Sequence, residues 1–162
     1  MGDKLKRTIE HGQHVIKLYE RSTLVWLGSF VAPVVTEVYY AMPAPDEWPK
    51  VQVRARRGIL ARYNYKRGRR RGLMLDDENF NQAFKVTTSN EDFAIMLLSP
   101  AVQEYMLRKR TVDWSVGEGT IKLWYRGSLK KSRIKRAVER LVGFHELIAE
   151  ELFDYTKGYP SP

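Results

Sequence analysis

The most regular hydrophobic pattern of the chain lies near its C-terminus. Six positions recur there at alternating steps of four and three residues, and they are Ile134, Val138, Leu141, His145, Ile148 and Leu152. This spacing gathers the six side chains on one face of an α-helix and leaves charged residues on the other. The pattern predicts one long amphipathic helix from Ser132 to Leu152.

Alternating or continuous apolar segments predict β-strands in the rest of the chain. Apolar and polar side chains alternate at 51–56, which is typical of a strand with a buried face and a basic outer face. Segments 114–116 and 121–125 flank Gly117-Glu118-Gly119, and this arrangement predicts a β-hairpin. Further strands are predicted at 23–30, 36–42, 59–65, 73–75 and 80–88.

Shorter helices are predicted from spacing and from capping residues. Apolar positions at helical spacing indicate an amphipathic helix over residues 3–19, which Gly12 weakens. The polar run at 89–92 can accept the free amide hydrogens of a first helical turn. Pro100 suits the first position of the helix that follows.

Together these elements predict an α+β fold, in which helices pack a small antiparallel sheet of about four to six strands. Three prolines between Pro43 and Pro49 cannot continue a helix or a central strand. We therefore expect a Pro-rich connector at 43–50. It would join an N-terminal helix and apolar strands at 1–42 to a main domain at 51–154, with a tail at 155–162.

One segment, LDDENFNQAFKVTTSNEDFAIMLLSP at 75–100, resembles the C-terminal soluble region of uncharacterised actinobacterial membrane proteins. The matching residues are Glu78, Phe80, Asn81, Phe84, Val86, Asp92, Phe93, Ala94, Leu98 and Pro100. The resemblance continues weakly at 114–116, at 121–124 and in the closing helix. It implies a small antiparallel sheet backed by helices and carries no known activity.

The proteins of that group have transmembrane segments upstream. We expect none here, because no stretch of this chain approaches ~20 uninterrupted apolar residues. A freestanding, very basic version of such a domain suggests a mobile element or an actinobacterial phage as its source. The expected location is cytoplasmic, or virion-associated if a phage encodes the chain.

Charge changes this picture more than any other property of the composition. The chain has 28 lysines and arginines against 19 acidic residues, a formal net charge of +9. Such an excess favours nucleic acid, an anionic membrane surface or an acidic protein as partner. The chain has no cysteine, which excludes disulfides, thiolate zinc sites and cysteine nucleophiles.

The basic residues concentrate between Lys50 and Leu75, a window without Asp or Glu. The candidate polyanion-binding residues are Arg54, Arg56, Arg57, Arg62, Tyr63, Tyr65, Lys66, Arg67, Arg69, Arg70 and Arg71. Arginine forks suit phosphate, and exposed tyrosines can stack on unpaired bases. We expect Arg67, Arg69, Arg70 and Arg71 on one exposed loop after a strand. Alternatively, the charges solvate an exposed sheet edge or meet an acidic protein.

A second basic run stands at the start of the predicted C-terminal helix. Its members are Lys130, Lys131, Arg133, Lys135 and Arg136. Positive charge at a helix N-terminus opposes the helix dipole, so its presence suggests a use. The alternative is ordinary solvation of a charged surface.

Catalytic and metal-binding patterns are missing from the sequence. The adjacent carboxylates at 76–78 would point to opposite faces of a strand, and His11, His14 and His145 have no completing ligand. There is no phosphate loop, dinucleotide fingerprint or nucleophile elbow. We therefore expect no catalytic site, no metal and no cofactor.

Three functions remain. The first is a non-catalytic binding module whose arginine-rich surface meets nucleic acid or another polyanion. The second is a structural or protein-interaction component, for example of a phage particle. The third is a peripheral membrane-surface protein, which the membrane-protein resemblance and the basic charge suggest.

Overall fold

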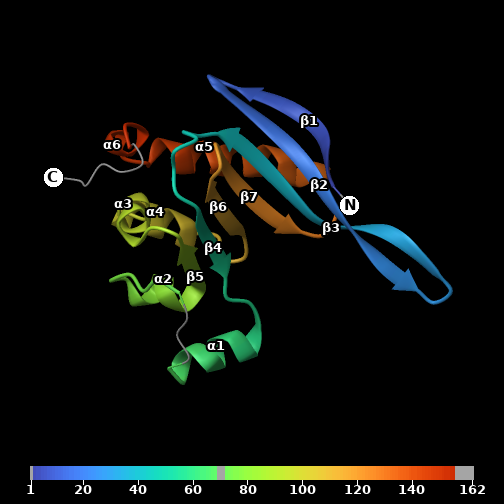
Figure 1. The fold of residues 1–162 in the computed structure, drawn as a ribbon, viewed down its shortest axis with the longest axis horizontal. Helices are drawn as coiled ribbons and strands as arrows, with labels where there is room; N and C mark the ends of the chain where they lie inside the picture. The colour runs from blue at the N-terminus through green and yellow to red at the C-terminus, as the bar shows by residue number, and fades with distance from the viewer. Residues whose placement is uncertain (1, 69–71, 156–162) are drawn as a thin grey trace.

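The protein folds around one seven-stranded antiparallel sheet with the strand order β1-β2-β3-β7-β6-β4-β5 (Figure 1). The computed structural model describes residues 2–68 and 72–155. The strands are β1 (Asp3–His11), β2 (His14–Leu27), β3 (Phe30–Pro43), β4 (Val51–Ala55), β5 (Phe84–Thr88), β6 (Asp113–Gly117) and β7 (Thr120–Arg126). With its helices, the sheet confirms the predicted α+β fold, but it has seven strands where about four to six were expected.

The predicted helix at 3–19 is wrong, because this segment is the hairpin of β1 and β2. Gly12 adopts φ +60° in the turn, a conformation that glycine reaches without strain. Ile16 and Leu18 are buried, whereas the alternating residues Val15 and Lys17 are exposed, which is the two-residue period of a strand. The apolar positions at 3–19 matched helical spacing because residues of two antiparallel strands, β1 and β2, were counted as one series.

Strands β2 and β3 extend beyond the rest of the sheet as a two-stranded hairpin. The register pairs Ser22 with Val35 and continues to Leu27 with Phe30, while β7 pairs with β3 only from Glu37 onward. We call residues 22–35 the arm. Figure 1 shows it projecting away from the helices. The predicted strand at 36–42 is confirmed as part of β3, whereas 23–30 is a strand only to Leu27, because the turn of the hairpin falls at residues 28–29.

The region after β4 differs most from the sequence-based expectation. The strand at 51–55 is confirmed, but 59–65 is not a strand and belongs to helix α1 (Gly58–Lys66). Both edges of β4 are already paired, with β5 on one side and β6 on the other. Segment 73–75 makes only a single bridge, from Leu73 to Val86.

Side chains that cap the N-terminus mark where each of the next three helices begins. Phe80 lies in α2 (Glu78–Ala83), not in a strand, because the Asp77 side chain accepts hydrogen bonds from the first-turn amides. The predicted helices after residues 89–92 and at Pro100 are confirmed as α3 (Glu91–Leu97) and α4 (Pro100–Leu107). Asn90 caps α3 and Ser99 caps α4.

The predicted hairpin at 114–125 is confirmed as β6 and β7. Its two-residue turn consists of Glu118 at φ +54° and Gly119 at φ +73°. Positive φ at both central positions defines the turn type that matches the twist of paired strands. Trp114 and Trp124 lie on these paired strands but on opposite faces of the sheet.

The long C-terminal helix is present as α5 (Ile134–Glu146), preceded by a 3-10 turn, η1 (Lys131–Arg133). It ends before the predicted Leu152, and a short helix α6 (Glu150–Phe153) follows. Ile148 and Leu152 remain buried, and the Leu152 carbonyl accepts a hydrogen bond of 2.7 Å from Trp48 Nε1. The predicted stripe is thus buried at four of its six positions and half-buried at Ile134 and His145, and it extends over α5, the link at Ile148 and α6.

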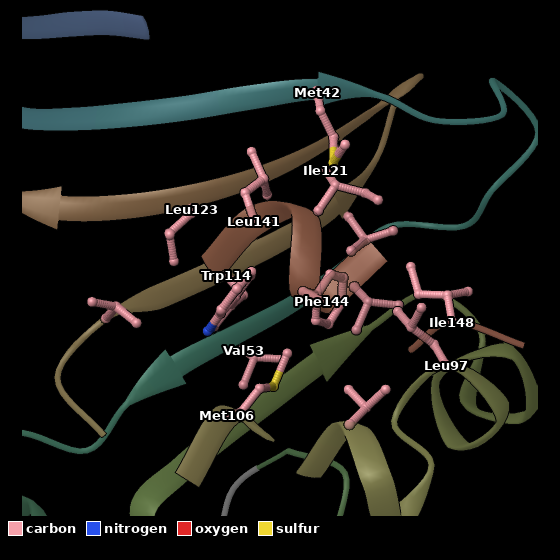
Figure 2. Packing of buried hydrophobic residues seen from close by; sticks show 14 of the residues in the cluster. Met42, Val53, Leu97, Met106, Trp114, Ile121, Leu123, Leu141, Phe144 and Ile148 are labelled. Atoms are coloured by element: carbon pink, nitrogen blue, oxygen red, sulfur yellow. The ribbon is translucent and has the colours of Figure 1, made fainter. Parts of the chain in front are cut away.

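Helix α5 packs on the face of the sheet that carries Trp114. The Trp114 and Phe144 rings lie with centroids 4.7 Å apart, and Figure 2 shows Leu141 and Phe144 facing the same layer of apolar side chains. This core cluster also includes Ile16 from β2, so one core joins residues on both sides of the Pro-rich segment. On the opposite face Tyr39 contacts the Trp124 ring, with centroids 4.3 Å apart.

Candidate polyanion-binding site

The structure distributes the predicted arginines over three environments. Arg54 is exposed on β4 and borders a hollow of about 230 Å³ together with Glu37 and Asp113. Arg56 and Arg57 follow β4, and the remaining described candidates lie on or directly after α1. The two adjacent basic strands that the sequence predicted are therefore one strand and one helix.

Arg56 is fixed by backbone carbonyls instead of a carboxylate. Its Nε donates to the carbonyl oxygens of Asn81 at 2.9 Å and Phe84 at 3.1 Å. Its guanidinium lies over the Tyr65 ring, 4.9 Å from the centroid. Burial lowers the pKa of Arg56, but guanidinium remains charged in proteins. Arg56 is thus a rigid cation without an acidic partner in the described part of the chain.

Arg57 has an acidic partner and a fixed orientation. Its Nη1 lies 3.1 Å from Asp113 Oδ2, and its Nη2 donates to the Thr111 carbonyl oxygen at 2.7 Å. Asp113 also accepts a hydrogen bond from the Ala55 amide at the end of β4. These bonds tie the start of α1 to the start of β6.

The two candidate tyrosines differ in exposure. Tyr65 is only 2% exposed, and its hydroxyl donates to Glu78 Oε1 at 2.7 Å. Tyr63 is 49% exposed, and Arg67 lies 4.9 Å above its ring. Tyr63 therefore exposes part of its ring to solvent, whereas the buried Tyr65 ring packs against the Arg56 guanidinium.

Arg56, Arg57 and Tyr65 border a pocket of about 450 Å³ between α1, the end of α2 and the loop after α4. Its cationic lining residues are Arg56, Arg57, Lys66 and Arg110. Lys66 and Arg110 are exposed and have no carboxylate within ion-pair distance among residues 2–68 and 72–155. None of the described residues that line the pocket is acidic.

Arg110 was not among the predicted site residues. The basic pair Lys109-Arg110 at the end of α4 was visible in the sequence, but nothing local connects it with α1. Conversely, the fold contains Arg62 within α1, and its side chain is not described. Arg69, Arg70 and Arg71 lie outside the described residues, so the predicted four-arginine loop stays a prediction.

The second basic run borders a different groove, of about 640 Å³, between β1 and α5. Lys131 and Lys135 line it together with Lys6 and Arg7, above an apolar floor that includes Ile134. Part of this run is already engaged elsewhere. Arg133 lies over the Tyr125 ring at 4.6 Å, and Lys135 pairs with Glu139 at 3.9 Å.

The exposed members of the second run are Lys130, Lys131, Lys135 and Arg136. A cation of β1 beside the same groove is also paired, since Lys6 Nζ lies 3.1 Å from Glu20 Oε2. More of the positive charge on this surface is therefore neutralised by carboxylates than in the pocket beside α1.

Neither a metal centre nor a bilayer-spanning helix accompanies these basic surfaces in the described ranges. No three side chains of His, Asp or Glu there are arranged to hold a metal ion. His14 and His145 contact each other, with ring centroids 4.9 Å apart, and burial lowers the pKa of His145. No described helix is both long and apolar enough to cross a bilayer.

Comparison with known proteins adds no relative. No protein-family model, no curated protein and no solved structure matches the chain. The function is therefore inferred from the geometry of the chain itself.

Proposed function

We propose that this protein is a non-catalytic module that binds a polyanion, nucleic acid in the first place, at the pocket beside α1. The observation that carries the proposal is the lining of this pocket, whose described residues include four cationic side chains and no acidic one. We call Arg56, Arg57, Lys66 and Arg110 the basic pocket.

The balance of charge in the basic pocket favours an anionic ligand. Only Arg57 has a described carboxylate partner, at 3.1 Å. Clefts lined by one sign of charge focus the field and concentrate ions of the opposite sign. Arg56 and Arg57 are held by 2.7–3.1 Å hydrogen bonds, so little side-chain freedom is given up when a phosphate binds.

Tyr63 extends the basic pocket toward a nucleic acid with unpaired bases. Its exposed ring lies beside Arg67 on α1, the same helix that contributes Lys66 to the pocket. Aromatic side chains bind successive bases by stacking, while adjacent cations follow the phosphate backbone. A flexible single strand can satisfy both features, so single-stranded DNA or RNA is the preferred probe.

The test is a titration of fluorescent single-stranded DNA and RNA at salt concentrations from about 50 to 200 mM. The variant Lys66→Ala/Arg110→Ala removes the two exposed cations. For a single strand, the slope of log affinity against log salt should fall by roughly 0.7 for each phosphate that the variant no longer neutralises. The thermal midpoint should stay close to that of the wild type, because exposed charges contribute only ~0–1 kcal/mol.

The matched control is Lys131→Ala/Arg136→Ala, which removes the same charge from the second basic run. Its salt slope should remain that of the wild type. An equal reduction in both variants would assign binding to overall charge and reject the basic pocket. Absence of wild-type binding at the lowest salt would reject the nucleic-acid function.

A further inference from the structure

The arm carries more of the exposed large apolar side chains than any other segment of the described residues. Between Arg21 and Glu37 the sequence contains no charged residue. Six of its side chains are large, apolar and exposed, with exposed fractions from 39% to 75%, and they are Leu24, Trp26, Leu27, Phe30, Val31 and Val34. Trp26 is the most exposed of them, at 75%.

Both faces of the arm are apolar. The register pairs Trp26 with Val31, and the next pair, Leu27 with Phe30, points to the opposite face. A hairpin that covered its own core would alternate apolar and polar residues, because only one face would be buried. Two apolar faces indicate that a partner encloses the arm or that arms pack together.

The exposed apolar area of the arm is comparable to the largest patch on an ordinary monomer, and patches of this size are often functional. Exposed aromatic and aliphatic side chains of this number amount to several hundred Å², the size of the largest patch on an ordinary monomer. If two such arms pack together, their combined buried area approaches the ~1,200 Å² at which specific interfaces begin.

Charges at the base of the arm identify the kind of partner. Asp3, Arg21, Glu37 and Arg126 are register partners across β1, β2, β3 and β7, so their signs alternate along one row. Arg21 Nε lies 2.8 Å from Asp3 Oδ1, and Arg21 Nη1 lies 3.7 Å from Glu37 Oε2. The row is neutral, with two cations and two anions.

A neutral base does not fit an anionic membrane. Segments that insert into such membranes flank their apolar residues with lysine and arginine. The arm also has two outer strand edges, and a bilayer has no water to satisfy the backbone groups of such edges. An acidic protein partner does not fit either, because cations would be needed to attract it and the arm has none.

An uncharged arm with a neutral base fits a partner with the same charge as the protein. Each copy of this chain has a net charge of +9, so two copies repel each other over most of their surfaces. The arm offers an interface that does not juxtapose like charges. We propose that two copies of this chain associate through their arms into a symmetric dimer.

The strand pairing of the arm allows such an association. The pairing of β1 with β2 begins at Arg21, and that of β7 with β3 begins at Glu37. Beyond these positions, the register of the described residues pairs β2 with β3 of the same hairpin, from Ser22 with Val35 to Leu27 with Phe30. Outer edges of a sheet readily add a further strand, and a two-fold axis presents the same edge from both copies.

The test measures molar mass by sedimentation equilibrium over a wide range of protein concentration. Wild-type protein should be a dimer that dissociates on dilution. Trp26→Glu/Phe30→Glu should weaken the association roughly thirtyfold or more, because aromatic anchors carry most of the energy of an interface. The thermal midpoint of the dilute variant should match that of dilute wild type, since both side chains lie outside the core.

The control is Ile59→Glu/Leu60→Glu on α1, whose side chains are 87% and 75% exposed. It adds the same charge and removes similar apolar area elsewhere, so the dimer should persist. A monomeric wild type, or a dimer that survives the arm substitutions, would overturn the proposal. Sedimentation with phosphatidylserine vesicles that requires Trp26 and Phe30 in a monomeric protein would assign the arm to a membrane instead.

Discussion

Asn81 shows how single residues of the segment 75–100 shape the candidate site. Its side chain is only 3% exposed and bonds to both backbone groups of Leu75. Its own carbonyl oxygen accepts the hydrogen bond from Arg56 Nε at 2.9 Å. A buried amide therefore holds the chain before α2 and helps to orient one cation of the basic pocket.

Glu118 carries the one positive φ angle among the described non-glycine residues. This left-handed conformation costs most residues roughly 1–2 kcal/mol, but Asn tolerates it. Glu118 also lies 3.7 Å from Lys50 Nζ, in an ion pair in which Lys50 is 54% exposed and Glu118 72%. Such a pair contributes about 0–1 kcal/mol. On replacement of Glu118, the gain from a less strained backbone should therefore exceed the loss of the ion pair.

We therefore expect Glu118→Asn to stabilise the protein by about 1 kcal/mol and to raise its Tm by about 2–4 °C. Thermal unfolding followed by circular dichroism measures the effect. Glu118→Ala is the control, because it removes the ion pair and keeps the strained backbone. An equal rise in Tm for the alanine variant would show that the ion pair, not the turn, limits stability.

At the scale of elements, the apolar stripe near the C-terminus extends beyond the end of the helix on which it begins. Helix α5 ends at Glu146, yet Ile148 is 5% exposed and Leu152 is fully buried. The hydrogen bond from Trp48 to the Leu152 carbonyl attaches α6 to the segment before β4. Ile148 and Leu152 thus stay in the core although the first helix ends before them.

Replacement of Ile148 by Asp should destabilise the fold by at least about 3 kcal/mol, because it buries an unpaired carboxylate and removes apolar packing. Urea unfolding measures the change. Leu147→Asp is the matched control, since Leu147 is next in sequence and 38% exposed. Unchanged stability of the Ile148 variant would contradict the packing of α5 and α6 on the sheet.

At the scale of the molecule, the arm and the basic pocket belong to separate parts of the fold. The pocket is built from α1, α2 and the loop after α4, whereas the arm extends from β2 and β3 (Figure 1). The core cluster contains no side chain from residues 22–34, although Val35 packs against it. The rest of the protein should therefore fold without the arm.

A variant in which Asn-Gly replaces residues 24–33 tests this independence, because that dipeptide closes a two-residue hairpin. In dilute solution its free energy of unfolding should stay within about 1 kcal/mol of the wild-type monomer, as expected for changes outside the core. Its affinity for single-stranded DNA should equal that of the wild type at matched oligomeric state. A larger drop in stability would show that the arm supports the sheet.

The sequence by itself determined the elements whose signals lie within a few residues. Asn90 and Ser99 cap α3 and α4, and the turn at 117–119 places β6 beside β7, as predicted. The concentration of cations between Lys50 and Arg71, and hence the sign of the expected ligand, was also legible in the sequence. These features depend on local backbone preferences and on charge, which require no distant partner.

Only the tertiary structure decided which apolar segments are strands and which cations meet. Residues 3–19 became a hairpin because β3 offers β2 a partner, and 59–65 became a helix because β4 already has two neighbours. Arg110 joins Lys66 in one pocket although the two residues are far apart in the sequence. Strand pairing and pocket lining depend on contacts between distant residues, and hydrophobic periodicity within one segment carries no information about them.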